Sequence, residues 1–406
     1  MNAAPASARN HALDAMRASA LLLGVLLHAA LAYLPGPGIG WAVQDASTHP
    51  LFGALVFVIH SFRLGAFFLL AGYFGRLLHL RLGGGGFARN RLKRIFAPFA
   101  AGWLLVYPLL AFGWVWGAMK GAPALAPQAL AIGYSVALQQ LGGLVGVGGW
   151  KAGFPLSHLW FLYYLLLVYG LFLGARLLAL RTGLHTKELL TRTDHCTRFL
   201  LGSPWGLPVL ATATLAFLSG MEHWGLDTPD KTFVPHFPAL LLYTFIFELG
   251  WLLHRQTGLL DEIRRRWGSS LAIALIASVP ALLLVGAEGP TSSPALRVTF
   301  QFVYAFMMWS WILACLGLFL RFCACESGTW RYLADSSYWV YIIHLPVVTA
   351  LQVALSRSPL PCGTKFAIVA AGATLVSLAS YHLLVRSTPI GLLLNGRRYP
   401  FFTRPR

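Results

Sequence analysis

The sequence predicts an all-α polytopic membrane protein with about ten transmembrane helices and both termini in the cytoplasm. Two observations predict this class. Of 406 residues, 57% are hydrophobic and only 11% are charged, whereas a soluble domain carries roughly a quarter charged residues. The apolar residues also gather into stretches of about 20, the length that a helix needs to cross ~30 Å of hydrocarbon.

Ten apolar stretches are candidate spans, and the fifth is the shortest of them. They lie near 12–34, 51–78, 95–117, 157–180, 206–221, 236–254, 268–286, 296–320, 332–355 and 366–386. The Gly-rich, weakly apolar segment 124–150 is predicted to be a loop, with a re-entrant or surface helix as the alternative. Because no stretch resembles a soluble domain, residues 1–406 are predicted to form a single transmembrane domain.

The formal net charge of +18 would suit a nucleic-acid-binding protein, but its distribution argues against nucleic acid as a partner. Lys and Arg cluster in alternate segments between the apolar stretches, as the positive-inside rule requires of cytoplasmic loops. Arg17 and Arg63 lie within spans. With a cytoplasmic N-terminus, only six of the other basic residues fall outside: Lys120, Lys151, Lys231, Arg297, Arg357 and Lys365. The charge therefore sets the orientation and favours contact with anionic membrane lipid.

The first span carries polar residues on one face. At 100° per residue, Asp14, Arg17, Gly24 and His28 fall close together around the helix. Asp14 and Arg17, at i and i+3, are expected to pair. His28 lies ~16 Å further along the axis, too deep to reach water. The pair either anchors the helix end or takes part in a site. A buried structural role for His28 remains the alternative to catalysis.

The second span holds an arginine near its middle. His60 and Arg63 are one turn apart, and an intramembrane arginine requires a protein interior or a wet cavity. Arg63 is expected to hold a carboxylate or phosphate, or alternatively to pair with Glu248 in the sixth span.

The ninth span places Ser337, Tyr341 and His344 on one face, and Pro346 is expected to free a backbone carbonyl. His158 opens the fourth span at its outer end. The four imidazoles of His28, His60, His158 and His344 thus map to similar depth with Arg63, which predicts a shared cavity. Interfacial anchoring by aromatic and His residues is the alternative.

Two further patterns concern the cytoplasmic side. Arg91 and Arg94, at i and i+3, are placed to bind one anion, although positive-inside clustering also explains them. Cys323 and Cys325 form a C-x-C without a second cluster, so we expect no metal site, and five Cys in this length do not indicate a disulfide framework.

Five segments together resemble the acyltransferase 3 family of membrane acyltransferases. ALDAMRASALLLGVLLH resembles its L-D-x-x-R-(x)n-H opening, and FFLLAGYF its F-F-x-L-S-G-F segment, with Ala71 where Ser is usual. RLKRIFAP is similar to its R-x-x-R-(x)3-P motif, SHLWFLYYLLLVY to its H-L-W-F-L segment, and SSYWVYIIHLPVV to its S-Y-x-x-Y-x-x-H-x-P motif. FRLGAFFLLAGYF and TFIFELGWLLHR are most similar to the glucan-biosynthesis branch of the family.

This resemblance implies an enzyme that transfers acyl groups from cytoplasmic acyl-CoA, as co-substrate, to a hydroxyl of an extracytoplasmic carbohydrate. No bound cofactor is implied, and the location implied is the bacterial inner membrane. In the branch named, the implied reaction is succinyl transfer to periplasmic glucans, with acetyl transfer as the other option. The family's essential histidine corresponds to His28, its acidic and basic partners to Asp14 and Arg17, and its paired arginines to Arg91 and Arg94.

From the residues we expect His28 to act as base or nucleophile, with His344 or Tyr341 sharing or orienting the proton. Arg63, His60 and His158 are expected to contact substrate, together with the two cytoplasmic arginines. The alternatives are a transporter of a sugar, acyl donor or anion, since intramembrane Arg and His also mark transport paths, and a structural or sensory subunit. The sequence does not define the acceptor, the acyl chain or the oligomeric state.

Overall fold

The computed structural model describes residues 10–36, 40–145, 153–183, 186–289 and 292–399. Within these residues the protein is helical and has no β-strand. The helices are α1 (His11–Ala30), α2 (Pro50–Arg91), α3 (Ala97–Ala118), α4 (Ala126–Val145), α5 (Trp160–Arg181), α6 (Lys187–Gly202), α7 (Gly206–Leu218), α8 (Phe237–Leu253), α9 (Thr257–Arg265), α10 (Trp267–Leu284), α11 (Pro294–Phe322), α12 (Gly328–Leu355), α13 (Cys362–Ser380) and α14 (Pro389–Asn395).

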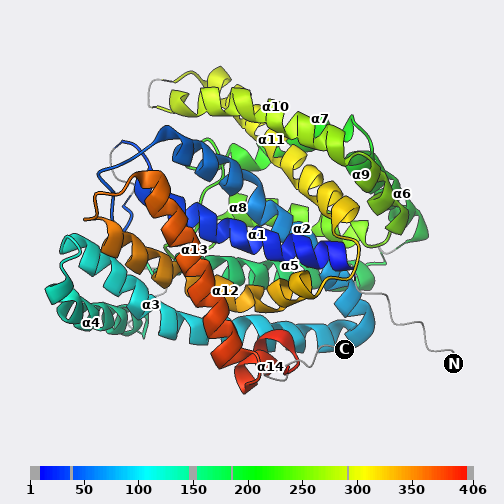
Figure 1. Ribbon diagram of the computed structural model, residues 1–406. Coiled ribbons are helices and arrows are strands. Elements are labelled where there is room, and N and C mark those ends of the chain that lie inside the picture. Colours follow the sequence, from blue (N-terminus) through cyan, green and yellow to red (C-terminus); the bar gives the residue numbers. More distant parts are fainter. Residues whose placement is uncertain (1–9, 37–39, 146–152, 184–185, 290–291, 400–406) are drawn as a thin grey trace.

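The prediction of a polytopic all-α membrane protein is confirmed at this level. By length and composition, seven helical segments of the described chain qualify as membrane spans, or nine if each of two sharply bent helix pairs is one span. One of the seven is Pro50–Ala118, with 69 residues, which is far longer than one crossing needs. Gly83 interrupts it with φ +68°, and α2 and α3 are separate rods in Figure 1.

The prediction of a loop over 124–150 is wrong, and one further helix was not predicted. Segment 124–150 contains the 20-residue helix α4, which packs on α3 where Gly133 approaches the backbone of Phe112; residues 146–150 lie outside the described chain, so the re-entrant alternative stays open. The region between the fourth and fifth spans contains α6, which meets α7 at 105°. The charged sequence of α6 gave no sign of a span, but it forms an amphipathic helix with Thr186 as its N-cap. The helix is held in place by Asp194, whose carboxylate accepts two 2.7 Å hydrogen bonds from Arg255.

The centre of the bundle is α1, which packs against α2, α11, α12 and α13 (Figure 1). The side chain of Asn10 caps its first turn by accepting a hydrogen bond from the Leu13 amide. The α2 helix is fixed against α8 by two glycines: a Cβ on Gly72 would overlap Phe247, and a Cβ on Gly250 would overlap Leu69. Such small residues let transmembrane helices touch backbone to backbone, which fixes the position of the polar residues of α2.

The loop that follows α1 is held by a buried ion pair. Lys365 Nζ lies 2.9 and 2.8 Å from the two carboxylate oxygens of Asp45, and both side chains are only 2% exposed. The Asp45 amide also donates to the Ala32 carbonyl at 2.8 Å. The pair therefore connects the end of α1 to the start of α13, and Lys365 is a buried structural residue rather than a free loop charge.

We expect Asp45→Asn or Lys365→Met alone to destabilise the protein by about 3–5 kcal/mol, since each leaves a buried charge without its partner. The double variant should recover much of this loss. Thermal or denaturant unfolding in detergent measures the effect. The control is Arg192→Gln, which breaks the exposed pair with Glu188 and should cost at most about 1 kcal/mol. Equal losses in the control and the single variants would contradict the structural role.

Candidate functional site

The structure brings three of the four predicted histidines together. Nδ1 of His28, on α1, lies 2.9 Å from Nε2 of His344, on α12. The rings of His158 and His344 are 5.3 Å apart, and those of His28 and His344 are 5.1 Å apart. His60 is separate from these ring contacts, and its Nε2 lies 3.1 Å from Thr228 Oγ1. The expected histidine cluster is thus a triad of His28, His344 and His158.

The hydrogen bonds of the triad define its tautomers. Nδ1 of His344 lies 3.0 Å from the Val340 carbonyl and 2.8 Å from the Tyr341 carbonyl. Because carbonyls only accept, this nitrogen carries the proton and Nε2 of the neutral ring must accept. His28 therefore donates through Nδ1, which leaves its Nε2 with an unprotonated lone pair. A general base or a nucleophile requires this form of imidazole.

His158 is fixed by a carbonyl that a proline leaves unpaired. Pro346 has no N–H, so the carbonyl of Ile342, four residues earlier, lacks its helical donor. His158 Nε2 lies 3.1 Å from that carbonyl and 3.1 Å from the Tyr341 carbonyl, and so donates to them. In return, the Tyr341 hydroxyl donates to the His158 carbonyl at 2.6 Å. These contacts lock the start of α5 onto α12.

The paired arginines lie beside a second carbonyl that a proline leaves unpaired. Arg94 falls in a π-helical turn, Leu92–Phe96, that joins α2 to α3, and Pro98 cannot donate to the Arg94 carbonyl. The Tyr338 hydroxyl donates to it instead, at 2.9 Å. The arginine motif and the ninth-span motif are therefore one structural unit, although they lie far apart in the sequence.

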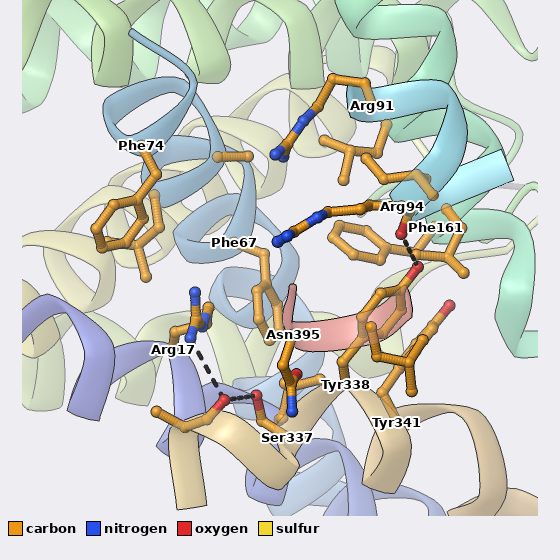
Figure 2. Close-up of a pocket in the computed structure, with 18 of the residues that line it drawn as sticks. Arg17, Phe67, Phe74, Arg91, Arg94, Phe161, Ser337, Tyr338, Tyr341 and Asn395 are labelled. Carbon is orange, nitrogen blue, oxygen red and sulfur yellow. Dashed lines mark hydrogen bonds between the residues drawn. The ribbon is translucent and has the colours of Figure 1, made fainter. Parts of the chain in front are cut away.

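Three arginines line one cavity of about 290 Å³, which Figure 2 shows. Arg91 and Arg94 extend into it from one side and Arg17 from another. Its remaining wall is largely apolar and aromatic, and includes Phe67 and Phe161. Tyr341 also lines it and connects it to the triad, since this residue lies one turn before His344 on α12.

Each arginine is oriented by neighbouring groups. Arg17 Nη2 lies 3.2 Å from an oxygen of Asp14, which confirms the expected ion pair, and 3.3 Å from the Ala334 carbonyl. Arg91 donates to Asn90 and stacks over the rings of Phe87 and Tyr169. The Arg94 guanidinium lies against Gly396, whose φ of +75° ends α14. The cavity thus joins the start of α1 and the C-terminal helix at one end of the bundle.

Arg63 lies between the cavity residues and the triad. It is 8% exposed, and its buried Nε has no hydrogen-bond partner. Its guanidinium packs directly against Gly24, where a Cβ would overlap it. Because Gly24 is four residues before His28, the guanidinium sits roughly 6 Å along α1 from the imidazole. Among the described residues no ion pair joins the buried Arg63 to Glu248, which is exposed, so that alternative is wrong.

The sequence prediction missed two residues that contact His28. Trp41 stacks on its ring, with centroids 6.0 Å apart and planes 9° from parallel. Gln352, buried in α12, donates to the His28 and Ala29 carbonyls at 3.0 Å and accepts from the Trp41 indole at 2.8 Å. Carbonyls in the last turn of a helix lack helical donors, so this amide completes the end of α1. A buried polar residue in an apolar helix was a signal for Gln352, whereas nothing marked Trp41.

No group of three or more His, Cys, Asp or Glu side chains that could hold a metal ion occurs in the part of the chain that the structure describes. The polar groups that converge are instead neutral imidazoles, guanidinium groups and a tyrosine hydroxyl. These groups can accept a proton and stabilise negative charge within the bundle.

The chain belongs to the acyltransferase 3 family: the family model, described as an acyltransferase domain, matches residues 10–382. Together with its apolar helices, this match makes the protein a membrane-embedded member of that family. Among curated proteins it is similar to glucans biosynthesis protein C of Escherichia coli strain SMS-3-5, with 36% identity over 110 residues, and of Shigella dysenteriae serotype 1, with 37% identity over 112 residues.

Each of these two matches covers 27% of this chain and 26% of the relative. The chain thus spans about a quarter of the length of the curated relatives that it matches. No solved structure matches the chain.

Proposed function

We propose that the protein is a multi-pass acyltransferase of the bacterial inner membrane that moves an acetyl or succinyl group from cytoplasmic acyl-CoA to a hydroxyl of an extracytoplasmic carbohydrate. The observation that carries this proposal is the free Nε2 of His28, combined with a cavity lined by three arginines at the other end of the same helix. The names of the similar proteins support a glucan as the acceptor and therefore a periplasmic reaction.

The same arrangement supports the proposed topology of ten crossings with both termini in the cytoplasm. Counting α2 and α3 as separate spans and each bent pair as one span gives this number. Arg17 of α1 and Asn395 of α14 line the same cavity, so the first and last helices of the described chain share one end of the bundle. We assign residues 1–406 to a single transmembrane domain.

In the proposed reaction, the phosphates of CoA bind Arg91, Arg94 and Arg17, and the thioester arm runs past Phe67 and Phe161 toward His28. Guanidinium groups suit this role because they bind phosphate oxygens bidentately. The acceptor comes from the opposite end, where Trp41 covers the imidazole. The distance of ~16 Å between Arg17 and His28 along α1 requires an extended donor arm.

In the direct form of this mechanism, His28 Nε2 removes the proton of the acceptor hydroxyl as its oxygen attacks the thioester carbonyl. The C–S bond then breaks, and the proton passes from His28 to the departing thiolate, which leaves as CoA thiol. In the alternative form, Nε2 attacks the thioester carbonyl, the C–S bond breaks and CoA leaves as its thiolate. The acceptor hydroxyl then attacks the acyl-imidazole, the C–N bond breaks to restore the imidazole, and the hydroxyl proton passes to the CoA thiolate. In both forms His344 holds His28 in the reactive tautomer, and Arg63 stabilises the oxyanion or binds the carboxylate of a succinyl group.

Acyl-CoA turnover by the purified protein tests this proposal. With acetyl- or succinyl-CoA and a glucan acceptor, we expect free thiol release that is matched by acylated acceptor. Arg91→Gln with Arg94→Gln should raise KM for the CoA donor by roughly tenfold or more, since each charge-assisted hydrogen bond is worth about 1.5–3 kcal/mol.

Arg181→Gln is the control because Arg181 is exposed and lies outside the cavity. Binding of sugar or anion without any thiol release, together with transport into vesicles, would instead establish a transporter, the second candidate that buried Arg and His permit.

A further inference from the structure

A second pocket, of about 300 Å³, is lined by Arg264, Arg265, Trp267 and Arg321. It lies where α9, α10 and α11 meet. It shares no residue with the cavity that Arg17, Arg91 and Arg94 line. We propose that this pocket binds the headgroup phosphate of an anionic phospholipid. This lipid site is independent of the acyl-transfer reaction.

The pocket is built on a helix with the geometry of a membrane-surface helix. The chain bends by 109° between α8 and the segment Gly258–Arg265. Along α9, Leu259, Leu260 and Ile263 are buried, whereas the arginines that follow are exposed. A short amphipathic helix at a right angle to a spanning helix lies in the plane of the membrane–water interface.

The arginine of α11 is brought to this corner by close packing. A Cβ on Gly317 would meet the Ile263 carbonyl at 2.8 Å and the Trp267 Cα at 3.1 Å, so α11 touches the backbone of the α9–α10 junction. Arg321 follows one turn later, and its guanidinium lies 5.8 Å from the ring centroid of Phe322. The rings of Trp267 and Phe322 are 5.0 Å apart and edge-on. Trp is enriched at the headgroup level of a bilayer, where this pocket would lie.

The charges of the pocket are available to a ligand. Within the described chain neither Arg265 nor Arg321 forms an ion pair with a carboxylate, whereas Arg264 pairs with the exposed Asp261 at 3.2 Å. Nearby arginines are already engaged: Arg198 pairs with Glu262, and Arg266 donates to the Gly202 carbonyl. Two unpaired guanidinium groups therefore face a pocket that fits a phosphate.

The apolar surroundings favour a lipid over a free phosphate. The pocket lies at the start of α10, and this helix exposes a continuous apolar face along its length. That face comprises Leu275, Ile276, Val279 and Leu283, which are 53–77% exposed. In the membrane it contacts acyl chains. A phospholipid would place its phosphate in the pocket and its chains along α10, and basic pockets on the cytoplasmic side are typical sites for anionic headgroups.

Thermal unfolding of the detergent-solubilised full-length protein tests the proposal. Phosphatidylglycerol, phosphatidylcholine and glycerol phosphate are added separately to the wild type and to Arg265→Gln/Arg321→Gln. We expect phosphatidylglycerol to raise the wild-type midpoint by several degrees, and phosphatidylcholine and glycerol phosphate to have little effect. In the double variant the apparent affinity for phosphatidylglycerol should fall by at least tenfold.

Arg181→Gln/Lys187→Gln removes the same charge from two exposed residues elsewhere and should respond as the wild type does. A charge-only effect would weaken both double variants equally, and this result would overturn the site. A full stabilising response to glycerol phosphate alone would overturn the assignment to lipid and indicate a site for free anions.

Discussion

Replacing His28 with Ala should lower acyl-CoA turnover by roughly 10²–10⁴-fold, the contribution usual for a positioned general base, while the protein still inserts and unfolds normally. The physical reason is the free Nε2: its partner nitrogen is engaged with His344, so the ring presents one unprotonated nitrogen in a fixed direction. Thiol release by the purified protein, with acetyl- and succinyl-CoA, measures the loss.

His344 sets the tautomer in this scheme, so its substitutions should differ by chemistry. His344→Gln keeps an oxygen that can accept from His28 Nδ1, and it should retain more turnover than His344→Leu, which cannot accept. His223→Ala is the matched control, since His223 is an exposed residue that contacts Glu288. A His28→Ala protein with full activity would sink the mechanism, and equal losses in the two His344 variants would show that this residue acts only in packing.

Arg63→Met should reduce turnover by roughly 10²–10³-fold, the loss expected when one donor to a developing oxyanion is removed. The buried guanidinium has an Nε without a partner, so a ligand that reaches it gains a hydrogen bond at little cost in reorganisation. The choice of donor separates its two possible roles. An oxyanion role predicts equal losses with acetyl- and succinyl-CoA, and a carboxylate role predicts a much larger loss with succinyl-CoA.

Gly24 offers a milder test of the same group. Gly24→Ala would push the Arg63 guanidinium from its position, because a Cβ there overlaps it. The expected effect is a clear loss of turnover with little loss of stability, since only the end of a long side chain must move. Gly170→Ala, where nothing lies within 4 Å of a Cβ, is the control. Unchanged turnover in both Gly24→Ala and Arg63→Met would remove Arg63 from the mechanism.

The sequence predicted those parts of the site that depend on helical periodicity. The Asp14–Arg17 pair is a local contact, so the spacing sufficed. The depth of His28 and His344 followed from the spans, but their contact did not, because α1 and α12 are joined only in the folded bundle. The pairing of Arg63 with Glu248 was wrong for the same reason: depth alone does not say which face of α8 meets α2.

The helices of the fold were predicted where their sequences are long and apolar, and missed where they are not. Apolar length identified α1, α5, α11 and α12 with bounds close to those observed. It missed α6, because a charged sequence is typical of a loop. It also missed the 20 residues of α4, because their sequence is only weakly apolar. Trp41 lay beyond any sequence rule, because it reaches His28 from a loop whose path depends on tertiary contacts such as the ion pair of Asp45 with Lys365.

In the proposed reaction, α1 carries both Arg17, which binds the CoA phosphates, and His28, which reacts. The helix therefore fixes the distance between these two groups. Arg17 and His28 are eleven residues apart. Inserting a single residue between them would lengthen the distance along α1 by ~1.5 Å and turn His28 by 100° away from His344. Any insertion or deletion between Arg17 and His28 therefore changes both their distance and the direction in which His28 points. In the proposed mechanism a donor with a shorter arm would reach either the arginines or the imidazole but not both, so α1 would select donors by their length.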